Sequence, residues 1–575
     1  MMANSFLIVI GQPMALSGQS PAYHDASVEL YTRQLNPNFM QTEFGDGFRV
    51  FLGECHPLKN QHTRAEIQPA GTRIHFSARD RVLSVESDRL GTAMVYWKQE
   101  QHRVLLSNRK ENLLTQTDTI DWPSVQQYLH TGYTVNRATF FNDIHQTEPD
   151  TRLIIRAETS QTAHLEITSE RISTGLLEEA NQPANVLLAD IADCLLNKLS
   201  ATPKSVIMMS AGWDSRTLLL GGSDNLAGAY THGDLSSREV ELARKLTGRQ
   251  RLDHLFVDVR QSPITVELIE QMLEELGSAV FPIWFLAARN IRQWKNAPIM
   301  SGVLGELLGG HYGLMSWGSR AHKLSASMLL FSDRLISEHH IRQGIERYCT
   351  PPASHWFVSS QGQTMLDTYR NETRQRTTNA IEEHYRIFGD WQQALENFNM
   401  HHRARQYILK QAHAASGSVG YTLPFANSKL VDLTRGLPFT ERVHNRANQK
   451  ILKANKPALL NESMAATLVP ARYPILIQEL SRAARIARET ASKMPGKQKP
   501  GLGWFNYDHL YEGRLLHDLI DSLEADIWDK NRMHAAVEAN PANGIDAGST
   551  LDMICKIKTV DHYLNRSATV QGMQP

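Results

Sequence analysis

The chain has 575 residues, more than one hydrophobic core usually supports, so we expect two or more domains. Lysine plus arginine and aspartate plus glutamate both number 60, and this zero formal charge argues against broad electrostatic binding of nucleic acid or an anionic membrane. Cys55, Cys194, Cys349 and Cys555 are far apart and form no CxxC pair, which is typical of a reduced cytoplasmic compartment rather than a disulfide framework or a zinc site. No apolar run approaches membrane-spanning length, and we expect a cytoplasmic protein without a membrane partner.

Short β-rich runs separated by turn-forming pieces fill residues 1–170. The turns include "FGDG" and "DRLG". The runs predict a sheet-rich N-terminal domain; they are "SFLIVIG", "FRVFLGE", "TRIHFSA", "RVLSVES", "TAMVYWK", "HRVLLSN" and "TRLIIRA".

Helical patterning takes over in residues 185–575. The helix "NVLLADIADCLLNKL" leads into the strand "SVIMM", and the strands "LAGAYTH", "HLFVDV" and "APIMSG" follow among further helical runs. Those helical runs are "SSREVELARKLTG", "VELIEQMLEELGS", "NAIEEHYRIFGDWQQALENF" and "ILIQELSRAARIARETAS". The alternation predicts an α/β domain, with a parallel sheet covered by helices that becomes helical toward the C-terminus.

The run "SVIMMSAGWDSRTLLLGG" (205–222) turns from strand to helix at Ser210, Ala211, Gly212, Asp214 and Ser215. In a parallel sheet, ligands bind beyond the carboxyl ends of the strands, where helix N-termini attract phosphate. Small residues allow an oxyanion to approach the backbone, and an acid at this place suits Mg²⁺. The alternative, a helix cap and a tight turn with nothing bound, stays open on this pattern alone.

Several segments resemble the asparagine synthetase family, in the family's order. "SAGWDS" is similar to its SGGxDS pyrophosphate loop, with Ala211 replacing the second glycine. "MSGVLGELLGGHYG" (300–313) resembles its second ATP-site signature, S-G-x-G-x-D-E-x-x-G-G, and "GYTLPFANSKLVDLTRGLP" resembles a later stretch. "SVESDRLGTAMVYWKQEQHRVLLSNRKENLL" is similar to the glutaminase-like domain that precedes these synthetases.

The resemblance implies a fold and an activity. The fold is an N-terminal α+β sandwich of the Ntn-hydrolase type (1–170), followed by a pyrophosphate-loop synthetase domain (185–575). The activity is an AMP-forming, ATP-dependent ligase that adenylates a small-molecule or peptide carboxylate and then joins it to an amine or ammonia. ATP and Mg²⁺ are implied as cofactors, and pathway proteins remain open as partners.

The resemblance also assigns roles to individual residues. Ser210, Ala211, Gly212 and Ser215 would cradle pyrophosphate, Asp214 would bind Mg²⁺, and Ser301 and Gly302 would line the nucleotide. Glu306 would be a metal ligand and a catalytic residue. The catalytic lysine of the family falls near "NRANQKILKANK", where Lys450 is our choice, with Lys453 and Arg442 as the other candidates.

Two features depart from the family. Its glutaminase nucleophile is a cysteine that follows the initiator methionine, whereas this chain reads "MMANSF" and its nearest cysteine is Cys55. A thioether cannot replace a thiol, so we expect the glutaminase-like domain to be inactive. The second departure is Gly305, which stands where the family has an aspartate before Glu306.

Two other functions compete with the ligase. A non-catalytic binding or scaffold module is favoured by Ala211 and Gly305. Another ATP pyrophosphatase-type, nucleotide-activating enzyme, such as one for sulfur transfer, lacks the expected cysteines near the loop. Retention of both Asp214 and Glu306 favours the ligase.

Overall fold

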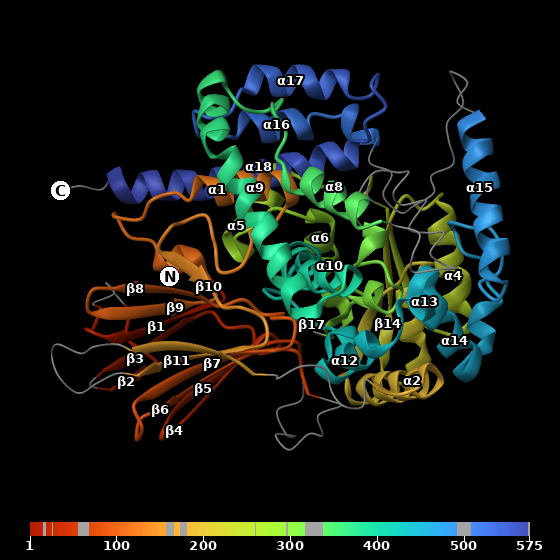
Figure 1. Ribbon diagram of the computed structural model, residues 1–575, viewed down its shortest axis with the longest axis horizontal. Helices are drawn as coiled ribbons and strands as arrows, with labels where there is room; N and C mark the ends of the chain where they lie inside the picture. Colours follow the sequence, from red (N-terminus) through yellow and green to blue (C-terminus); the bar gives the residue numbers. More distant parts are fainter. Residues whose placement is uncertain are drawn as a thin grey trace.

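The computed structural model describes residues 1–14, 19–25, 27–55, 68–156, 166–172, 181–258, 260–294, 297–316, 337–491 and 508–572. Two antiparallel sheets lie together at the lower left of Figure 1. The first has the order β10 (Ile144–Gln146), β8 (Tyr96–Glu100), β9 (Arg103–Ser107), β1 (Ser5–Gly11), β3 (Val28–Arg33), β2 (Tyr23–His24). The second has the order β12 (Glu166–Arg171), β11 (Thr151–Arg156), β7 (Val82–Ser87), β6 (Gly71–Ser77), β5 (Gly47–Gly53), β4 (Met40–Gly45).

Strand β1 is buried on both of its faces. Phe6, Ile8 and Ile10 pack between the two sheets, in one core with apolar residues of β5, β6 and β7. Leu7 and Val9 point to the opposite face and join a larger core that contains residues of helix α1 (Trp122–Thr131), of the parallel sheet and of much of the helical region. Because side chains alternate along a strand, a continuous apolar run fits this double burial.

The third sheet is parallel and has five strands. Its order is β15 (His254–Asp258), β14 (Leu226–Gly233), β13 (Ser205–Met208), β16 (Ile299–Met300), β17 (Tyr421–Thr422). The helices among these strands are α2 (Ala184–Ala201), α3 (Trp213–Leu218), α4 (Arg238–Arg249), α5 (Val266–Leu276) and α6 (Pro282–Asn290). The predicted parallel sheet with helices is therefore confirmed.

The remainder of the chain is mainly helical, as predicted (Figure 1). Its longer helices are α8 (Glu338–Cys349), α9 (Ser360–Phe388), α10 (Trp391–Asn399), α12 (Ser428–Gly436), α14 (Arg446–Asn455), α15 (Ile475–Ala491), α16 (Leu515–Asp521), α17 (Lys530–Ala539) and α18 (Ala547–Gly572). The short α11 (Lys410–His413) and α13 (Phe439–Arg442) lie between them. Among the described residues, no helix combines the length and the apolar character needed to cross a bilayer.

One predicted helical run is two helices in the structure. "NAIEEHYRIFGDWQQALENF" is divided at Gly389, whose left-handed φ of 65° ends α9. Asp390 then caps α10, because its side chain accepts a hydrogen bond from the backbone N–H of Gln393. The boundary between residues 1–170 and 185–575 stays a prediction, since one hydrophobic core runs from β1 to α18.

Candidate functional site

The site is built on two neighbouring strands of the parallel sheet. β13 and β16 pair directly, with Ile207 opposite Met300. The pyrophosphate-loop candidate follows β13 and leads into α3, and the second motif follows β16 and leads into the short 3₁₀ helix η6 (Gly305–Leu307). Because the carboxyl ends of parallel strands share one edge, the sheet brings the two motifs together.

Hydrogen bonds within the first loop fix its shape. The Ser215 hydroxyl donates to the Ser210 carbonyl at 2.9 Å, and the two serine Oγ atoms are 2.9 Å apart. Ser210 Oγ also accepts from the Gly212 N–H at 3.1 Å. Ala211 is buried, so its methyl group does not narrow the open side of the loop. These hydrogen bonds fix the conformation of the loop at the start of α3, and both serine hydroxyls take part in them.

A buried arginine anchors the helix that follows. Arg216 donates to the carbonyls of Leu459, Glu462 and Ser463, each at 3.0 Å. One turn of α3 is thus tied to a segment nearly 250 residues later. Residues 459–463 therefore stabilise the position of α3 and of the loop that precedes it.

Two glycines let the second motif approach Asp214 closely. A Cβ on Gly302 would lie 3.2 Å from Asp214 Cβ, and a Cβ on Gly305 would lie 2.5 Å from Asp214 Cγ. Between them, Leu304 has a left-handed φ of 76°, a strained conformation for a leucine. With Asp214 in this position, no side chain fits at residue 305. The close approach of Asp214 therefore explains why residue 305 is a glycine, which the family signature alone does not explain.

The close approach joins two acids. Burial, and then the charge of Glu306, raise the pKa of Asp214 well above its usual range. Glu306 accepts a 3.0 Å hydrogen bond from the Tyr312 hydroxyl, whose own pKa is raised by burial and then by Glu306. A bound cation would therefore favour the ionised form of Asp214.

The donor set fits Mg²⁺. Mg²⁺ in proteins commonly takes one or two carboxylates, with substrate phosphates and water completing its octahedron. The described residues hold no group of three or more His, Cys, Asp or Glu side chains that could form a protein-only metal cage. Asp214 and Glu306 can therefore hold Mg²⁺ together with a phosphate, rather than alone.

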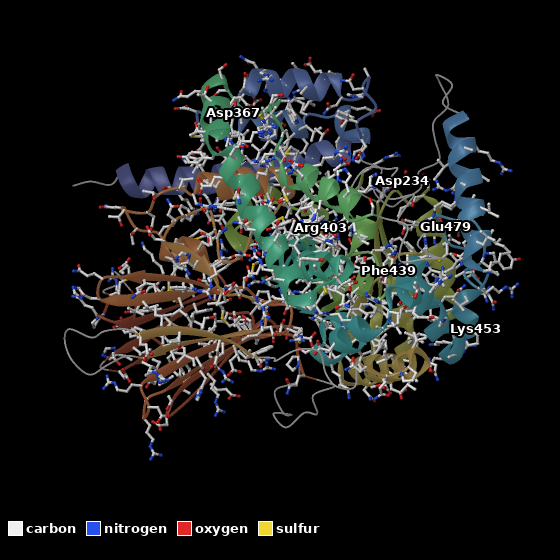
Figure 2. All side chains as sticks on the ribbon, viewed as in Figure 1. Asp234, Asp367, Arg403, Phe439, Lys453 and Glu479 are labelled. Atoms are coloured by element: carbon white, nitrogen blue, oxygen red, sulfur yellow. The ribbon has the colours of Figure 1, made fainter. Side chains whose placement is uncertain are left out.

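An arginine that sequence reasoning missed lies near this pair. Arg403 belongs to the π-helix η8 (Met400–Ile408), and its charge acts on Tyr312. It makes no hydrogen bond or ion pair with any residue that the structure describes, whereas Arg405 two positions on donates to the Gly91 and Thr147 carbonyls. Figure 2 shows Arg403 in the middle of the molecule, far from Lys453 at the edge. π-Helices are frequent at functional sites.

The structure also locates the other predicted residues. It brings together Ser210, Ala211, Gly212, Asp214, Ser215, Ser301, Gly302 and Glu306. Ser301 is buried, and its Oγ accepts from the Val303 N–H at 3.2 Å.

The three cationic candidates after the second motif have different surroundings, and Lys453 is exposed on α14. Lys450 is half-exposed on α14 and pairs with Glu441, and its catalytic role stays a prediction. Arg442 is fully buried and donates to Glu396 at 3.0 Å and to the Leu307 carbonyl at 3.1 Å. Arg442 therefore holds the backbone just after Glu306, which is a positioning role.

No protein-family model matches the chain, and no curated protein matches its sequence. The resemblance to asparagine synthetases therefore rests on the motifs themselves.

The contact at Gly305 gives a first prediction. Gly305→Ala should lower the free energy of unfolding by about 1–3 kcal/mol, because the new methyl group collides with the Asp214 carboxyl. Urea unfolding monitored by circular dichroism measures this. Gly248→Ala, in α4 with open space around it, is the control and should be neutral or slightly stabilising. Equal stability of the wild type and Gly305→Ala would contradict the close approach.

Proposed function

We propose that the protein is an ATP-dependent ligase that adenylates a carboxylate and then forms an amide bond with an amine or ammonia. The observation that carries this proposal is the pairing of Asp214 with Glu306 at the carboxyl edge of a parallel sheet, beside the small-residue turn that opens α3. Such a turn suits phosphate, and the two acids suit a divalent cation. The family resemblance supplies the reaction.

Each part of the site has a role in this reaction. The first N–H groups of α3 bind the departing pyrophosphate, and Ser301 and Gly302 line the nucleotide. Asp214 and Glu306 would hold Mg²⁺, and the ion would supply charge neutralisation for the phosphates. Catalysis then depends mainly on positioning the two reactants and on charge neutralisation.

Arg403 is our candidate for binding the carboxylate substrate. A guanidinium that has no hydrogen-bond or ion-pair partner in the described ranges, and whose charge acts on Tyr312, offers paired N–H donors to a carboxylate. We assign it to the carboxylate substrate.

The non-catalytic module is the second candidate. It was favoured by Ala211 and Gly305. The Gly305 argument is weakened, because a side chain at this position would collide with Asp214 in this geometry, and the Ala211 argument remains. The ligase is therefore the better supported of the two.

Pyrophosphate exchange tests the chemistry. The correct carboxylic acid should stimulate incorporation of labelled pyrophosphate into ATP without any amine, because adenylation is reversible in this family. Glu306→Gln should slow exchange about 100-fold while ATP still binds, and Asp214→Asn should weaken Mg²⁺-dependent ATP binding measured by calorimetry. Glu538→Gln, on the exposed face of α17, is the matched control. Aspartate is screened first, then peptides and uronic acids.

Different failures have different meanings. ATP binding without exchange for any acid would favour the non-catalytic module. A normal exchange rate in Glu306→Gln would instead exclude this glutamate as a catalytic residue.

Arg403 generates a separate prediction. Arg403→Met should raise the KM for the acid that supports exchange about tenfold or more, since a charge-assisted contact is lost, and should leave the KM for ATP unchanged. Arg374→Met, at a half-exposed arginine paired with Glu346 on α8, is the control. A changed KM for ATP alone would contradict the assignment to the carboxylate.

Glutamine hydrolysis is the fourth test. Burial raises the pKa of Cys55 to about 11 and that of Cys349 to about 12, and it also raises that of Cys555. Cys194 is buried beside Asn427. Thiolates, the reactive form, are therefore scarce at neutral pH, and we expect no glutamate release from glutamine above a no-enzyme control. Release that scales with protein concentration and disappears in Cys55→Ser would overturn this expectation.

A further inference from the structure

Two adjoining cavities lie between the antiparallel sheets and the helical region, away from Asp214. Their volumes are about 40 and 80 Å³. Both are lined by Met94, Tyr96, Lys110, Gly277 and Lys410, so the two cavities adjoin at these residues. Tyr96 comes from β8, Lys110 from the 3₁₀ helix η2 (Lys110–Leu113) and Lys410 from α11.

Three hydrogen-bond donors face this space without a strong acceptor. The Lys110 and Lys410 amines make no hydrogen bond or ion pair with the described part of the chain. The recorded partner of the Tyr96 hydroxyl is the Met94 sulfur at 3.9 Å, which is a weak acceptor. Because ammonium groups can only donate, the missing component is an acceptor.

Aromatic rings surround the Lys110 amine. Its Nζ lies 4.1 Å from the ring centroid of Tyr563, 4.5 Å from that of Phe140 and 5.5 Å from that of Tyr96. Such ring faces attract the protonated amine. They do not replace a counter-ion, so the half-buried Lys110 and Lys410, when protonated, have no carboxylate partner among the described residues.

The nearby acids are engaged elsewhere. Glu111 pairs with Arg109 at 2.5 Å and also contacts His562 at 3.5 Å, and Glu275 pairs with Arg289 at 3.4 Å.

We propose that this cavity binds a small dicarboxylate, with one carboxylate on Lys110 and the other on Lys410. A dianion balances the two ammonium charges, and its oxygens also accept from the Tyr96 hydroxyl. The two amines come from different elements, Lys110 from η2 and Lys410 from α11, so a ligand with two carboxylates can meet each of them. This site is independent of the ligase proposal, because it shares no residue with the Asp214 site.

The titration of the two lysines gives the proposal a pH signature. Burial lowers the pKa of Lys110 to about 7 and that of Lys410 to about 8, with a smaller contribution from the other charges around them. The dianion binds the protonated amines, so affinity is highest below pH 7 and falls as the pH rises through both values.

The other groups around the two lysines keep their charge in this range. Burial lowers the pKa of His413 to about 3, and it raises that of Tyr96 to about 12. Burial alone would raise the pKa of Glu111, but Arg109 and His562 hold it well below its usual range.

Calorimetry with malonate tests the site, and malonamide is the neutral control of the same shape. Full-length wild-type protein should bind malonate and not malonamide, with an affinity that falls roughly 100-fold from pH 6.5 to pH 8.5. Lys110→Met and Lys410→Met should each weaken binding about tenfold or more and reduce this pH dependence. Lys245→Met, at an exposed lysine paired with Glu241, should change neither.

Methionine keeps most of the length of the lysine side chain and removes an amine whose charged form is disfavoured by burial, so both cavity variants should unfold at a temperature no lower than that of the wild type. If either is unfolded, the same measurement is made on the glutamine variants. Equal binding of malonate and malonamide, unchanged affinity in both variants, or absence of saturable malonate binding would overturn the proposal. Binding of phosphate in place of malonate would overturn the assignment to a dicarboxylate.

Discussion

The contact between Gly305 and the Asp214 carboxyl is the constraint on which the candidate site depends. Two loops that follow neighbouring strands occupy almost the same space, and they can do so only because residue 305 has no side chain. Glu306 is thereby brought close to Asp214, and the pKa of Asp214 rises. The repulsion between the two carboxylates disfavours their ionised forms, so a bound cation would stabilise the ionised pair.

The helical region holds both loops in place through buried arginines. Arg216, which follows the first loop, donates hydrogen bonds to three carbonyls of residues 459–463. Arg442 donates to the carbonyl of Leu307, which follows Glu306 in the second loop. Arg442 is neutralised by Glu396 from α10. Each guanidinium links a loop to a segment distant in sequence. The positions of Asp214 and Glu306 therefore depend on contacts with the C-terminal half of the chain as well as on the sheet.

Much of this fold could be predicted from local pattern. The apolar runs that became β1, β6 and β13 have strand periodicity or continuous burial, and α2 and α5 have helical spacing. β17 could not be predicted, because Tyr421–Thr422 is too short to carry a pattern and exists through its pairing with β16. The break at Gly389 was visible as a glycine, but the run on both sides had the same helical period.

The site was predictable only in part, for the same reason. Ser210, Asp214 and Glu306 belong to local motifs and could be found there, whereas Arg403 lies in a π-helix, for which the sequence offers no periodicity signal. Gly305 was visible, but its sequence context indicated a lost acid. Only the position of Asp214 gives it a steric meaning, and that position depends on contacts between residues about 90 apart.

Charge balance distinguishes the two proposed ligand sites from the buried ion pairs of the fold. The chain has no net formal charge, and buried pairs such as Arg89–Asp150 and Arg442–Glu396 are complete within the fold. At Asp214, burial and the charge of Glu306 instead raise the pKa, and at Lys110 and Lys410 burial lowers it to about 7 and about 8. At both places the fold favours the neutral forms, and a ligand of opposite sign would favour the charged ones. The two proposed sites therefore differ in the sign of their ligand: a cation with its phosphate at one, and an organic anion at the other.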